Sequence, residues 1–474
     1  MKHFVYRTLD ELRRGADELG AAHVRFEDNP QEVRRLLGQS VPVGRFTVGN
    51  SLAIHPMEGC DGTLDGRPDE LTWRRYERFA RGGAKLIWFE ATAVREDGRA
   101  NTRQLWITRE NVGDYARLLD MIRRVHREEY GSADDLLVPL QLTHSGRYSV
   151  PRRFIAYHNS AIDRKSKVPP DYPCISDDEL ACLEDDYEAA ARLAWEAGFR
   201  AFDIKTTHGY LLSELMGAKT REGCYGGAVE NRTRFMRNVM GKIRAALGRG
   251  AMLCMRLGCF DGVPYYRDPQ TGLGVPSEFS VPYAGFGVDP QNPLQDDLAD
   301  VKQALACFRD AGLELLNVSL ACPYTNPHIG RPFEKPDEGN YEQPEHPLIG
   351  VDRHFRIASE LQRSFPELPM VGTGYTWLQK FAINAGAKNI ADGSIRFVGI
   401  GRGALAYPEF AREALAHGEL DERRVCKTLT YCTYLMRQKD HPLGQWPTGC
   451  PPFDKEGYGQ IIKLQREARR TNGR

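Results

Sequence analysis

The chain has 474 residues, with 41% hydrophobic and 27% charged side chains, and its 64 basic residues balance its 64 acidic residues to a formal net charge of zero. This is the composition of a soluble globular enzyme with one large domain or two medium ones. A nucleic-acid partner is not expected, because binding it requires a basic surplus or a basic stripe. A membrane partner is not expected either, because no window approaches the roughly 18 apolar residues of a spanning helix.

Residues 1–45 are interpreted as an N-terminal helix and a turn that cap the floor of the following domain. Their first 20 residues alternate charged and apolar side chains at helical spacing and lack the apolar run of a secretory signal. The 11 cysteines of the chain are scattered and odd in number, which suits reduced thiols better than a disulfide framework. We therefore expect a cytoplasmic protein.

Eight short apolar runs follow, each typical of a buried strand. They are residues 45–54, 84–94, 135–144, 200–208, 251–258, 313–320, 368–374 and 395–403. Helix-like segments lie between most of them, such as residues 176–198, 230–248 and 296–312. Strands that alternate with helices predict a parallel sheet. Eight such units, each of about 30 to 60 residues, predict a closed α/β barrel, the (β/α)8 or TIM barrel, over residues 46–415.

Three connections are longer and richer in proline and glycine than ordinary loops: residues 146–175, 261–294 and 322–350. We expect them over the C-terminal face, where such barrels keep their active sites. The aromatic residues of the second loop are Tyr265, Tyr266, Phe279, Tyr283 and Phe286. These rings fit a bulky, flat or apolar substrate, and they equally fit packing of the loop onto the barrel or onto a second subunit of a homo-oligomer.

Two glycine turns stand at the seventh and eighth predicted strand ends, in residues 371–376 and 399–403. The second turn lies at the last strand and has an incomplete GxGxxG spacing, which disfavours a Rossmann dinucleotide site. Barrels commonly bind phosphate at these two loops through backbone amides, and Arg402 adds a charge-assisted fork. We interpret the turns as a phosphate cradle; the alternative is that the glycines only make tight turns.

Residues 204–215, "IKTTHGYLLSEL", open polar and close apolar, as a strand end running into a helix does. Lys205, His208 and Tyr210 place an amine, an imidazole and a phenol on this short turn. Each of the three can donate a hydrogen bond. Together they indicate a functional site rather than a core.

Several stretches resemble the old yellow enzyme family, the flavin-dependent ene-reductases, and the barrel domain of the related 2,4-dienoyl-CoA reductases. They are "NSLAIHPMEG", "WFEATAV", "PLQLTHSGR", "HGYLLSEL", "REGCYGGAVENRTRF", "MRLG" and "VGIGRGALAYPEFAR". They appear in the family's order and cover roughly residues 45–415, and the part from Tyr225 to Phe235 is especially specific. The resemblance implies a (β/α)8 barrel with FMN at its C-terminal mouth.

On this resemblance, Pro56 and Met57 lie along the flavin edge, and Ala91 supplies a backbone contact. Gln141 reads the pyrimidine edge of the flavin, which carries donors and acceptors as an amide does. Arg256 faces flavin N1 and O2, where its fixed positive charge stabilises the anionic reduced flavin.

The phosphate cradle of the family falls on Gly372, Gly374, Gly401 and Arg402. Glu58 departs from the family, which places a small residue, often Thr or Cys, near flavin O4. A carboxylate there opposes negative charge on the reduced flavin unless it is protonated or turned away.

The family binds a substrate carbonyl with a His–His or His–Asn pair three residues apart and takes a proton from a tyrosine two residues later. Here the pair is Lys205 and His208, and the tyrosine is Tyr210. Polarising the carbonyl lets the β-carbon of a conjugated alkene accept hydride from flavin N5, and a phenol can protonate the α-carbon. Lys205 departs from the family: its ammonium suits a carboxylate or a more anionic enolate, or it pairs with Asp203 or Glu214 and takes no direct part.

Residues 416–474 are expected to form a C-terminal helical extension. The dienoyl-CoA reductase relatives carry an iron–sulfur cluster there, but Cys426, Cys432 and Cys450 lack the close CxxC pair and the fourth thiolate of such a cluster. No zinc pattern fits either, so no metal is expected. The further flavin- and NAD-binding domains of those relatives are not expected, so NADH or NADPH should dock directly over the FMN.

The sequence therefore predicts an FMN-dependent oxidoreductase that uses NADH or NADPH to reduce an activated C=C bond of a small molecule in a ping-pong cycle. Two alternatives stay open. The same scaffold can act as a dehydrogenase or a double-bond isomerase, or the chain is a flavin-binding protein whose catalysis has lapsed, as Lys205 and Glu58 suggest. The presence of both His208 and Tyr210 argues against the lapsed protein.

Overall fold

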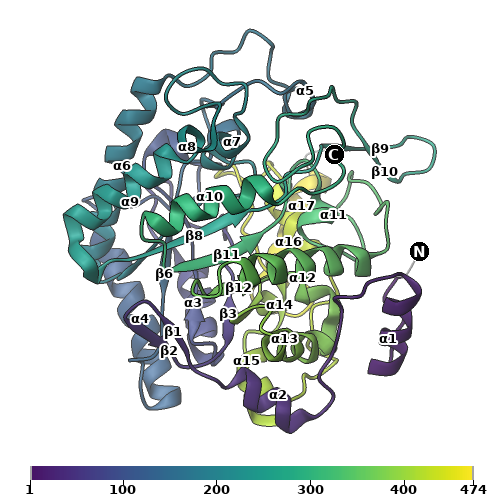
Figure 1. Ribbon diagram of the computed structural model, residues 1–474. Helices are drawn as coiled ribbons and strands as arrows, with labels where there is room; N and C mark the ends of the chain where they lie inside the picture. The colour runs from purple at the N-terminus through teal and green to yellow at the C-terminus, as the bar shows by residue number, and fades with distance from the viewer. Residues whose placement is uncertain (1–2, 472–474) are drawn as a thin grey trace.

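In the computed structural model, which describes residues 3–471, a parallel sheet rolls into a barrel with helices around it (Figure 1). Its strands are β3 (Leu52–Ile54), β4 (Leu86–Ile87), β5 (Phe89–Ala93), β6 (Pro139–Thr143), β7 (Ala201–Ile204), β8 (Met252–Gly258), β11 (Leu315–Ser319), β12 (Met370–Gly372) and β13 (Phe397–Ile400). They follow the order β4-β3-β13-β12-β11-β8-β7-β6-β5, and every paired neighbour is parallel. Because β4 and β5 are two halves of one strand on either side of Trp88, the ends of the sheet meet. The predicted (β/α)8 barrel is confirmed.

Helices between the strands form the outer wall of the barrel. They are α3 (Glu70–Arg81), α4 (Val112–Tyr130), α6 (Asp177–Glu196), α9 (Arg234–Leu247), α10 (Ala299–Asp310), α12 (Pro347–Ser364) and α13 (Ala382–Ala391). The start of α6 shows why they form: the Ser176 hydroxyl accepts from Glu179 N, and the Glu179 carboxylate accepts from Ser176 N, which is a capping box. Buried Leu180, Leu183 and Tyr187 follow at helical spacing, so this helix turns one apolar side to the sheet. The helices predicted over 176–198, 230–248 and 296–312 contain α6, α9 and α10.

The N-terminal segment contains α1 (Leu9–Glu18), α2 (Pro30–Leu37) and an antiparallel hairpin of β1 (Val41–Val43) and β2 (Phe46–Val48). Val41, Val43 and Val48 of the hairpin pack with residues at the first ends of the barrel strands, among them Leu315. The hairpin therefore closes the N-terminal end of the barrel. The predicted boundary between residues 45 and 46 falls in the turn of this hairpin.

The opposite, C-terminal end of the barrel is covered by long connections with short elements of their own. These are η1 (Glu96–Gly98), η2 (Gly146–Tyr148), α5 (Ser160–Ser166), α7 (Leu211–Gly217), α8 (Val229–Arg232), β9 (Tyr265–Arg267), β10 (Gly274–Pro276), α11 (Pro327–Gly330) and η4 (Tyr375–Phe381). The short turn η3 (Gly248–Gly250) instead joins α9 to the start of β8, at the N-terminal end of the barrel. The β9–β10 hairpin protrudes from the rest of the molecule in Figure 1. Within this layer the Tyr265 ring contacts His328 with centroids 4.6 Å apart, and Phe279 contacts Tyr283 at 6.1 Å.

After the last strand the chain forms α14 (Arg402–Ala406), α15 (Phe410–His417), α16 (Tyr431–Arg437) and α17 (Tyr458–Thr471), drawn from green to yellow in Figure 1. This C-terminal segment returns to the barrel mouth. Thr448 N donates to the carbonyl of Gly59 at 2.6 Å, and Arg75, on α3, donates to the hydroxyl of Tyr458 at 3.3 Å. Residues 1–2 and 472–474 of the predicted terminal regions lie outside the described residues.

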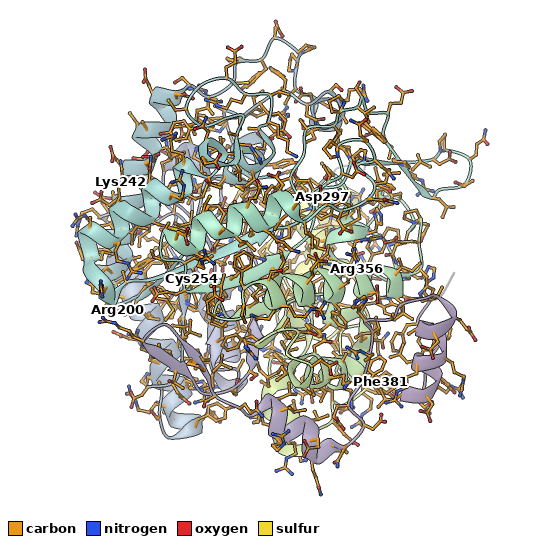
Figure 2. All side chains as sticks on the ribbon, viewed as in Figure 1. Arg200, Lys242, Cys254, Asp297, Arg356 and Phe381 are labelled. Carbon is orange, nitrogen blue, oxygen red and sulfur yellow. The ribbon has the colours of Figure 1, made fainter. Side chains whose placement is uncertain are left out.

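Side chains fill the space between the sheet and the helices, and charged residues such as Arg200 and Lys242 lie at the outer rim of the molecule (Figure 2). Within residues 3–471, none of the helices combines the length and the apolar character that a membrane-spanning segment requires.

Candidate active site

The turn between β7 and α7 carries three of the predicted site residues. Lys205 directly follows the strand, and Tyr210 is the residue before the first turn of α7, so the predicted strand-to-helix transition is confirmed. Between them, His208 and Gly209 have φ of 68° and 70°. A left-handed conformation is uncommon for histidine, and such backbone strain often marks a functional site.

These residues face a cavity of about 210 Å³ at the C-terminal end of the barrel. The predicted residues that line it are Pro56, Met57, Glu58, Gln141, Lys205, His208, Tyr210, Arg256, Gly374, Gly401 and Arg402. Two predicted residues within the described chain do not line it. The carbonyl of Ala91, in β5, accepts from Gln104 Nε2 at 3.3 Å, and Gly372, in β12, lies against the side chains of Ile395 and Tyr375.

Glu58 joins two of the predicted donors. Its Oε1 accepts from Lys205 Nζ at 2.7 Å, and its two carboxylate oxygens lie 3.0 and 3.2 Å from the Tyr210 hydroxyl. Lys205 therefore pairs with Glu58. The sequence analysis had considered pairing with Asp203 or Glu214 instead. The pairing offsets the negative charge of Glu58 within the cavity.

Burial decides the protonation state of the neighbouring donors. Burial, followed by the Glu58 carboxylate, raises the pKa of Tyr210 well above its usual value, so this group is a neutral phenol. Burial, followed by the charges of Arg256 and Lys205, lowers the pKa of His208 well below its usual value, so its imidazole is neutral. Burial also lowers the pKa of Lys205, and Glu58 opposes that shift.

Gln141 and Arg256 lie on the side of the cavity formed by β6 and β8. Gln141 Nε2 donates to Asp203 Oδ2 at 2.6 Å. The amide oxygen of Gln141 takes no part in this hydrogen bond. Arg256 Nη1 donates to the Pro56 carbonyl at 3.2 Å, while its Nε finds no hydrogen-bond partner among residues 3–471. Burial lowers the pKa of Arg256 to about 10, so the guanidinium is still cationic at neutral pH.

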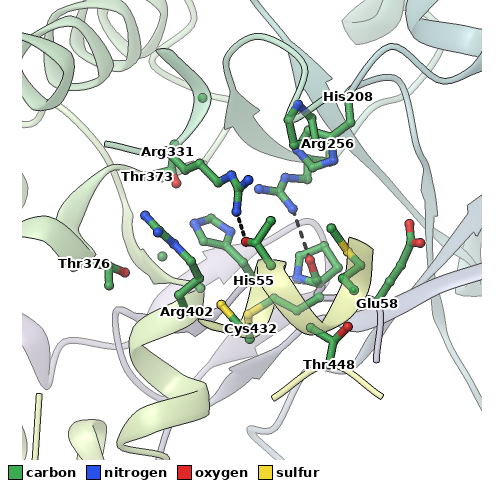
Figure 3. A pocket seen from close by; sticks show the side chains of 18 of the residues that line it. His55, Glu58, His208, Arg256, Arg331, Thr373, Thr376, Arg402, Cys432 and Thr448 are labelled. Atoms are coloured by element: carbon green, nitrogen blue, oxygen red, sulfur yellow. Dashed lines mark hydrogen bonds between the residues drawn. The ribbon is translucent and has the colours of Figure 1, made fainter. Parts of the chain in front are cut away.

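A second group of donors gathers at the other end of the cavity. Figure 3 shows Arg402, Thr373 and Thr376 there, away from Glu58 and His208. Arg402 Nη2 donates to the Pro332 carbonyl at 2.8 Å, and Arg331 donates to the Thr433 hydroxyl. Burial, followed by the charges of Arg402 and Arg437, lowers the pKa of Arg331 to about 10. Two half-buried guanidinium groups, close enough for the charge of one to lower the pKa of the other, favour an anion near them.

Some polar atoms of the cavity have no hydrogen-bond partner, and they indicate which kind of ligand fits there. Arg402 Nη1 and Arg331 Nε, like Arg256 Nε, are buried and unpaired within the part of the chain that the structure describes. A Cβ on Gly401 would lie 3.8 Å from Met57 Sδ and 3.9 Å from the His55 side chain, in ordinary van der Waals contact with two residues that line the cavity. Buried donors left unpaired are costly, so these residues fit an anionic ligand rich in acceptors, as FMN is.

A comparison with known families shows what this part of the chain is similar to. Residues 39–269 match the model of the NADH:flavin oxidoreductase / NADH oxidase family. This part of the chain is therefore similar to the flavin-dependent oxidoreductases of this family, which the old yellow enzymes represent. The match implies FMN as cofactor and NADH or NADPH as reductant.

Curated relatives named NADPH dehydrogenase match part of the chain. It is 28% identical to an NADPH dehydrogenase of Clostridium acetobutylicum over 227 residues, and this aligned region covers 47% of this chain and 64% of that protein. It is 32% identical to an NADPH dehydrogenase of Geobacillus sp. over 203 residues, and this aligned region covers 42% of this chain and 56% of that protein. The match thus spans less than two thirds of the length of each relative.

Solved structures are similar over more of the chain. A 2-naphthoyl-CoA reductase, solved with 2-naphthoyl-CoA, has a TM-score of 0.66 at 15% identity over 90% of this chain and 58% of that chain. The old yellow enzyme homologue of Zymomonas mobilis has a TM-score of 0.55 at 21% identity over 81% of this chain and 94% of that chain. At these identities the likeness establishes the shared fold alone.

The cavity also contains residues that the sequence interpretation missed. His55 directly precedes the predicted Pro56, and Tyr324 and Arg331 lie in the loop 322–350, which had been expected over this face. The C-terminal segment adds Cys432, Thr433, Met436 and Thr448, for which the sequence offers no signal. The rings of the loop 261–294, all within the described residues, are absent from the lining and pack within the loop layer instead.

Cysteines of the C-terminal segment lie near one another, since Cys426 and Cys432 both contribute to raising the pKa of Cys450, after its burial. Across residues 3–471, no group of three or more His, Cys, Asp or Glu side chains has an arrangement that could hold a metal ion.

Proposed function

We propose that the protein is an FMN-dependent oxidoreductase that uses NADH or NADPH to reduce an activated C=C bond of a small molecule. The observation that carries this proposal is that Lys205, His208 and Tyr210 share one cavity with the unpaired nitrogen atoms of Arg256 and Arg402. The first three suit a substrate with a polarised double bond, and the two arginines suit an anionic cofactor.

On this proposal two groups of lining residues would hold FMN. Pro56, Met57, Gln141 and Arg256 would hold its ring system, and Gly374, Gly401 and Arg402 would hold its phosphate. A bound FMN would supply the transfer of a hydride from NADH or NADPH to a carbon atom of the substrate.

The residues of the β7–α7 turn would act on the substrate. Neutral His208, whose Nε2 lies 3.3 Å from Ser319 Oγ, and the ammonium of Lys205 would donate hydrogen bonds to a carbonyl oxygen. Such donors withdraw electron density from the conjugated double bond. The neutral phenol of Tyr210 would then protonate the neighbouring carbon, as a general acid does.

The contact of Glu58 with Tyr210 favours a second candidate in the reverse direction. A carboxylate that accepts from the phenol can help it remove a proton from a substrate, as a dehydrogenase or a double-bond isomerase requires. The lapsed flavin-binding protein stays the remaining alternative.

Rapid mixing of the purified protein with NADPH or NADH, then with an enone such as 2-cyclohexenone, tests the proposal. We expect bleaching of the bound flavin by the nicotinamide and its recovery by the enone. A flavin that the nicotinamide bleaches but that no conjugated carbonyl compound reoxidises would contradict C=C reduction. A flavin that a saturated ketone bleaches would instead identify a dehydrogenase.

A further inference from the structure

Glu58 borders a second cavity, of about 460 Å³, in addition to the active-site cavity. Together with Tyr324 and Met436, it lines both cavities. The Glu58 side chain keeps 13% of its surface exposed, whereas that of Lys205 keeps 3%. Glu58 is therefore a polar group through which a proton can pass from one cavity to the other.

An unbroken chain of hydrogen bonds runs through Glu58. Lys205 Nζ lies 2.7 Å from Oε1, and the Tyr210 hydroxyl lies 3.0 Å from the same oxygen and 3.2 Å from Oε2. We propose that Glu58 relays a proton from Lys205 to Tyr210 in each turnover and that the second cavity resupplies this proton. The inference rests on the proposed function, because it requires that Tyr210 protonates the substrate.

The relay balances atoms and charge. The O–H bond of Tyr210 breaks as the new C–H bond forms on the substrate, and in the same step Glu58 gives Tyr210 a proton and takes one from Lys205. The chain then consists of an amine, a carboxylate and a phenol. The positive charge that Lys205 loses cancels the negative charge that the hydride brings to the substrate. Water in the second cavity returns a proton to Lys205 through Glu58 and leaves as hydroxide.

The surroundings of the three groups explain why a relay is needed. A tyrosinate at position 210 would be buried beside a carboxylate, and both burial and Glu58 raise the pKa of this phenol. Burial lowers the pKa of Lys205, so its ammonium gives up a proton more readily than one in water. The relay removes the tyrosinate as it forms and leaves no uncompensated charge in the cavity.

The walls of the second cavity suit the resupply. Arg153 donates to the carbonyls of Ser166 and Lys167, and Lys439 Nζ donates to Gln445 Oε1 at 2.9 Å. Their positive charges stabilise the hydroxide that remains when water gives up a proton.

Two variants of the holoenzyme test the relay. Glu58→Gln keeps an acceptor for Lys205 but cannot carry a proton, and Lys205→Arg keeps the positive charge but cannot release a proton, because arginine is not deprotonated in proteins. Both should still be reduced by NADPH, because the relay takes no part in that step. Both should reoxidise normally with ferricyanide, which takes electrons only. Both should reduce 2-cyclohexenone about 10²-fold more slowly, and the double variant should be no slower than either single variant.

Glu184→Gln is the matched control, because Glu184 is buried and accepts from the Tyr225 hydroxyl at 2.9 Å but lies outside both cavities. It should match wild type with all three reagents. A Glu58→Gln enzyme that reduces the enone at the wild-type rate would overturn the relay. So would equal slowing with the enone and with ferricyanide, since that would be a general effect on the cofactor. If wild type itself failed to reduce any enone, the proposed function would fail and the relay with it.

Two further measurements keep the relay testable if a variant does not fold. Thermal midpoints of the cofactor-free variants identify any misfolded chain without reference to activity. The wild-type enone step, measured in mixtures of H₂O and D₂O, should depend on the deuterium fraction along a curve, because more than one proton moves. A straight line would overturn the relay.

Discussion

Gln141 Nε2 donates a 2.6 Å hydrogen bond to Asp203 Oδ2, and this contact fixes which way the Gln141 amide faces. The same carboxylate also accepts from Trp88 Nε1 at 2.8 Å and from the backbone N of Arg256 at 2.7 Å. With its NH₂ group engaged there, Gln141 presents its oxygen to the cavity. On the proposed function, this oxygen would accept a hydrogen bond from the ring N–H of the flavin.

Replacing Gln141 tests this orientation. Gln141→Met removes the oxygen at similar length and should weaken FMN binding by about 1 to 1.5 kcal/mol, or roughly tenfold. Gln141→Glu should bind FMN more weakly still and lower the thermal midpoint, because it places a second carboxylate against Asp203. Titration of the cofactor-free chain with FMN, followed by flavin fluorescence, measures both. Equal affinity of the Met variant and wild type would show that Gln141 does not contact the flavin.

The pair of guanidinium groups at the other end of the cavity predicts opposite effects on the empty and the loaded protein. Arg402→Ala should weaken FMN binding by about 2–3 kcal/mol. Arg331→Gln keeps a donor for Thr433 and removes one of two neighbouring positive charges, so it should raise the thermal midpoint of the cofactor-free chain while weakening FMN. Inorganic phosphate should stabilise the cofactor-free wild type and not Arg402→Ala. Arg267→Gln, at an exposed position, is the control; phosphate stabilising Arg402→Ala as much as wild type would refute the cradle.

Tyr210→Phe removes the proposed proton donor with little change in volume. Its flavin should be reduced by NADPH nearly as fast as that of wild type, because no proton from Tyr210 enters that step. Reoxidation by an enone should slow about 10²–10⁴-fold, the usual contribution of general acid catalysis. Stopped-flow absorbance separates the two half-reactions. Equal slowing of both would remove Tyr210 from this role.

Lys205 predicts a coupled effect on ligand binding and on stability. Lys205→Ala should bind p-hydroxybenzaldehyde more weakly by roughly 1.5–3 kcal/mol, read from the long-wavelength absorbance of the stacked ligand. It should also lower the thermal midpoint, because Glu58 is left largely buried without its partner. Adding Glu58→Gln should recover part of that midpoint. Lys205→His should broaden activity toward plain enones, since a shorter, stiffer side chain spends less rotamer entropy on holding a neutral carbonyl. Unchanged ligand affinity in both variants would place Lys205 outside substrate binding.

Buried histidines predict that acid destabilises the cofactor-free chain. Burial lowers the pKa of His144 and His354 to about 3 and that of His328 to about 4, from about 6.5 in the unfolded chain. Below pH 6.5 the unfolded state therefore binds protons that the folded state does not, and each such proton costs about 1.4 kcal/mol of stability per pH unit. Glu90 and Asp261 act the other way, because burial raises their pKa to about 7 and the folded state retains their protons.

Asp186, Asp203 and Glu214 also have a raised pKa. The histidines with a lowered pKa still outnumber these carboxyl groups, since burial also lowers the pKa of His55, His126, His208, His346 and His441. Urea midpoints measured at pH 7, 6 and 5 should therefore fall stepwise. A midpoint that rises on acidification would mean that the carboxyl groups dominate.

Local signals in the sequence predicted the barrel and the β7–α7 turn because both depend on periodicity and on residues close in the chain. The alternation of apolar strands with helices fixes the order of elements, and the change from polar to apolar within residues 204–215 marks the start of α7. The resemblance to the family added residues from distant strands, such as Gln141 and Arg256, that only the closed barrel brings together.

The partner of Lys205 could not be predicted in the same way. Asp203 and Glu214 are close in the sequence, but Asp203 binds Gln141 and Trp88, and Glu214 binds Arg147. The actual partner, Glu58, is far away in the chain and reaches Lys205 only because the barrel places the end of β3 near the end of β7. Local patterns likewise do not tell where a C-terminal helix such as α16 packs.

The lining of the active-site cavity runs from His55, beside the first barrel strand, to Thr448, in the segment that follows the last one. A chain grows and folds from its N-terminus, so during synthesis the barrel exists for a time without this segment and its cavity is open to the solvent. FMN is therefore expected to become fully enclosed late in biogenesis, when this segment reaches the barrel mouth. A substitution or truncation in the last part of the chain is then expected to weaken the retention of the cofactor more than the folding of the barrel.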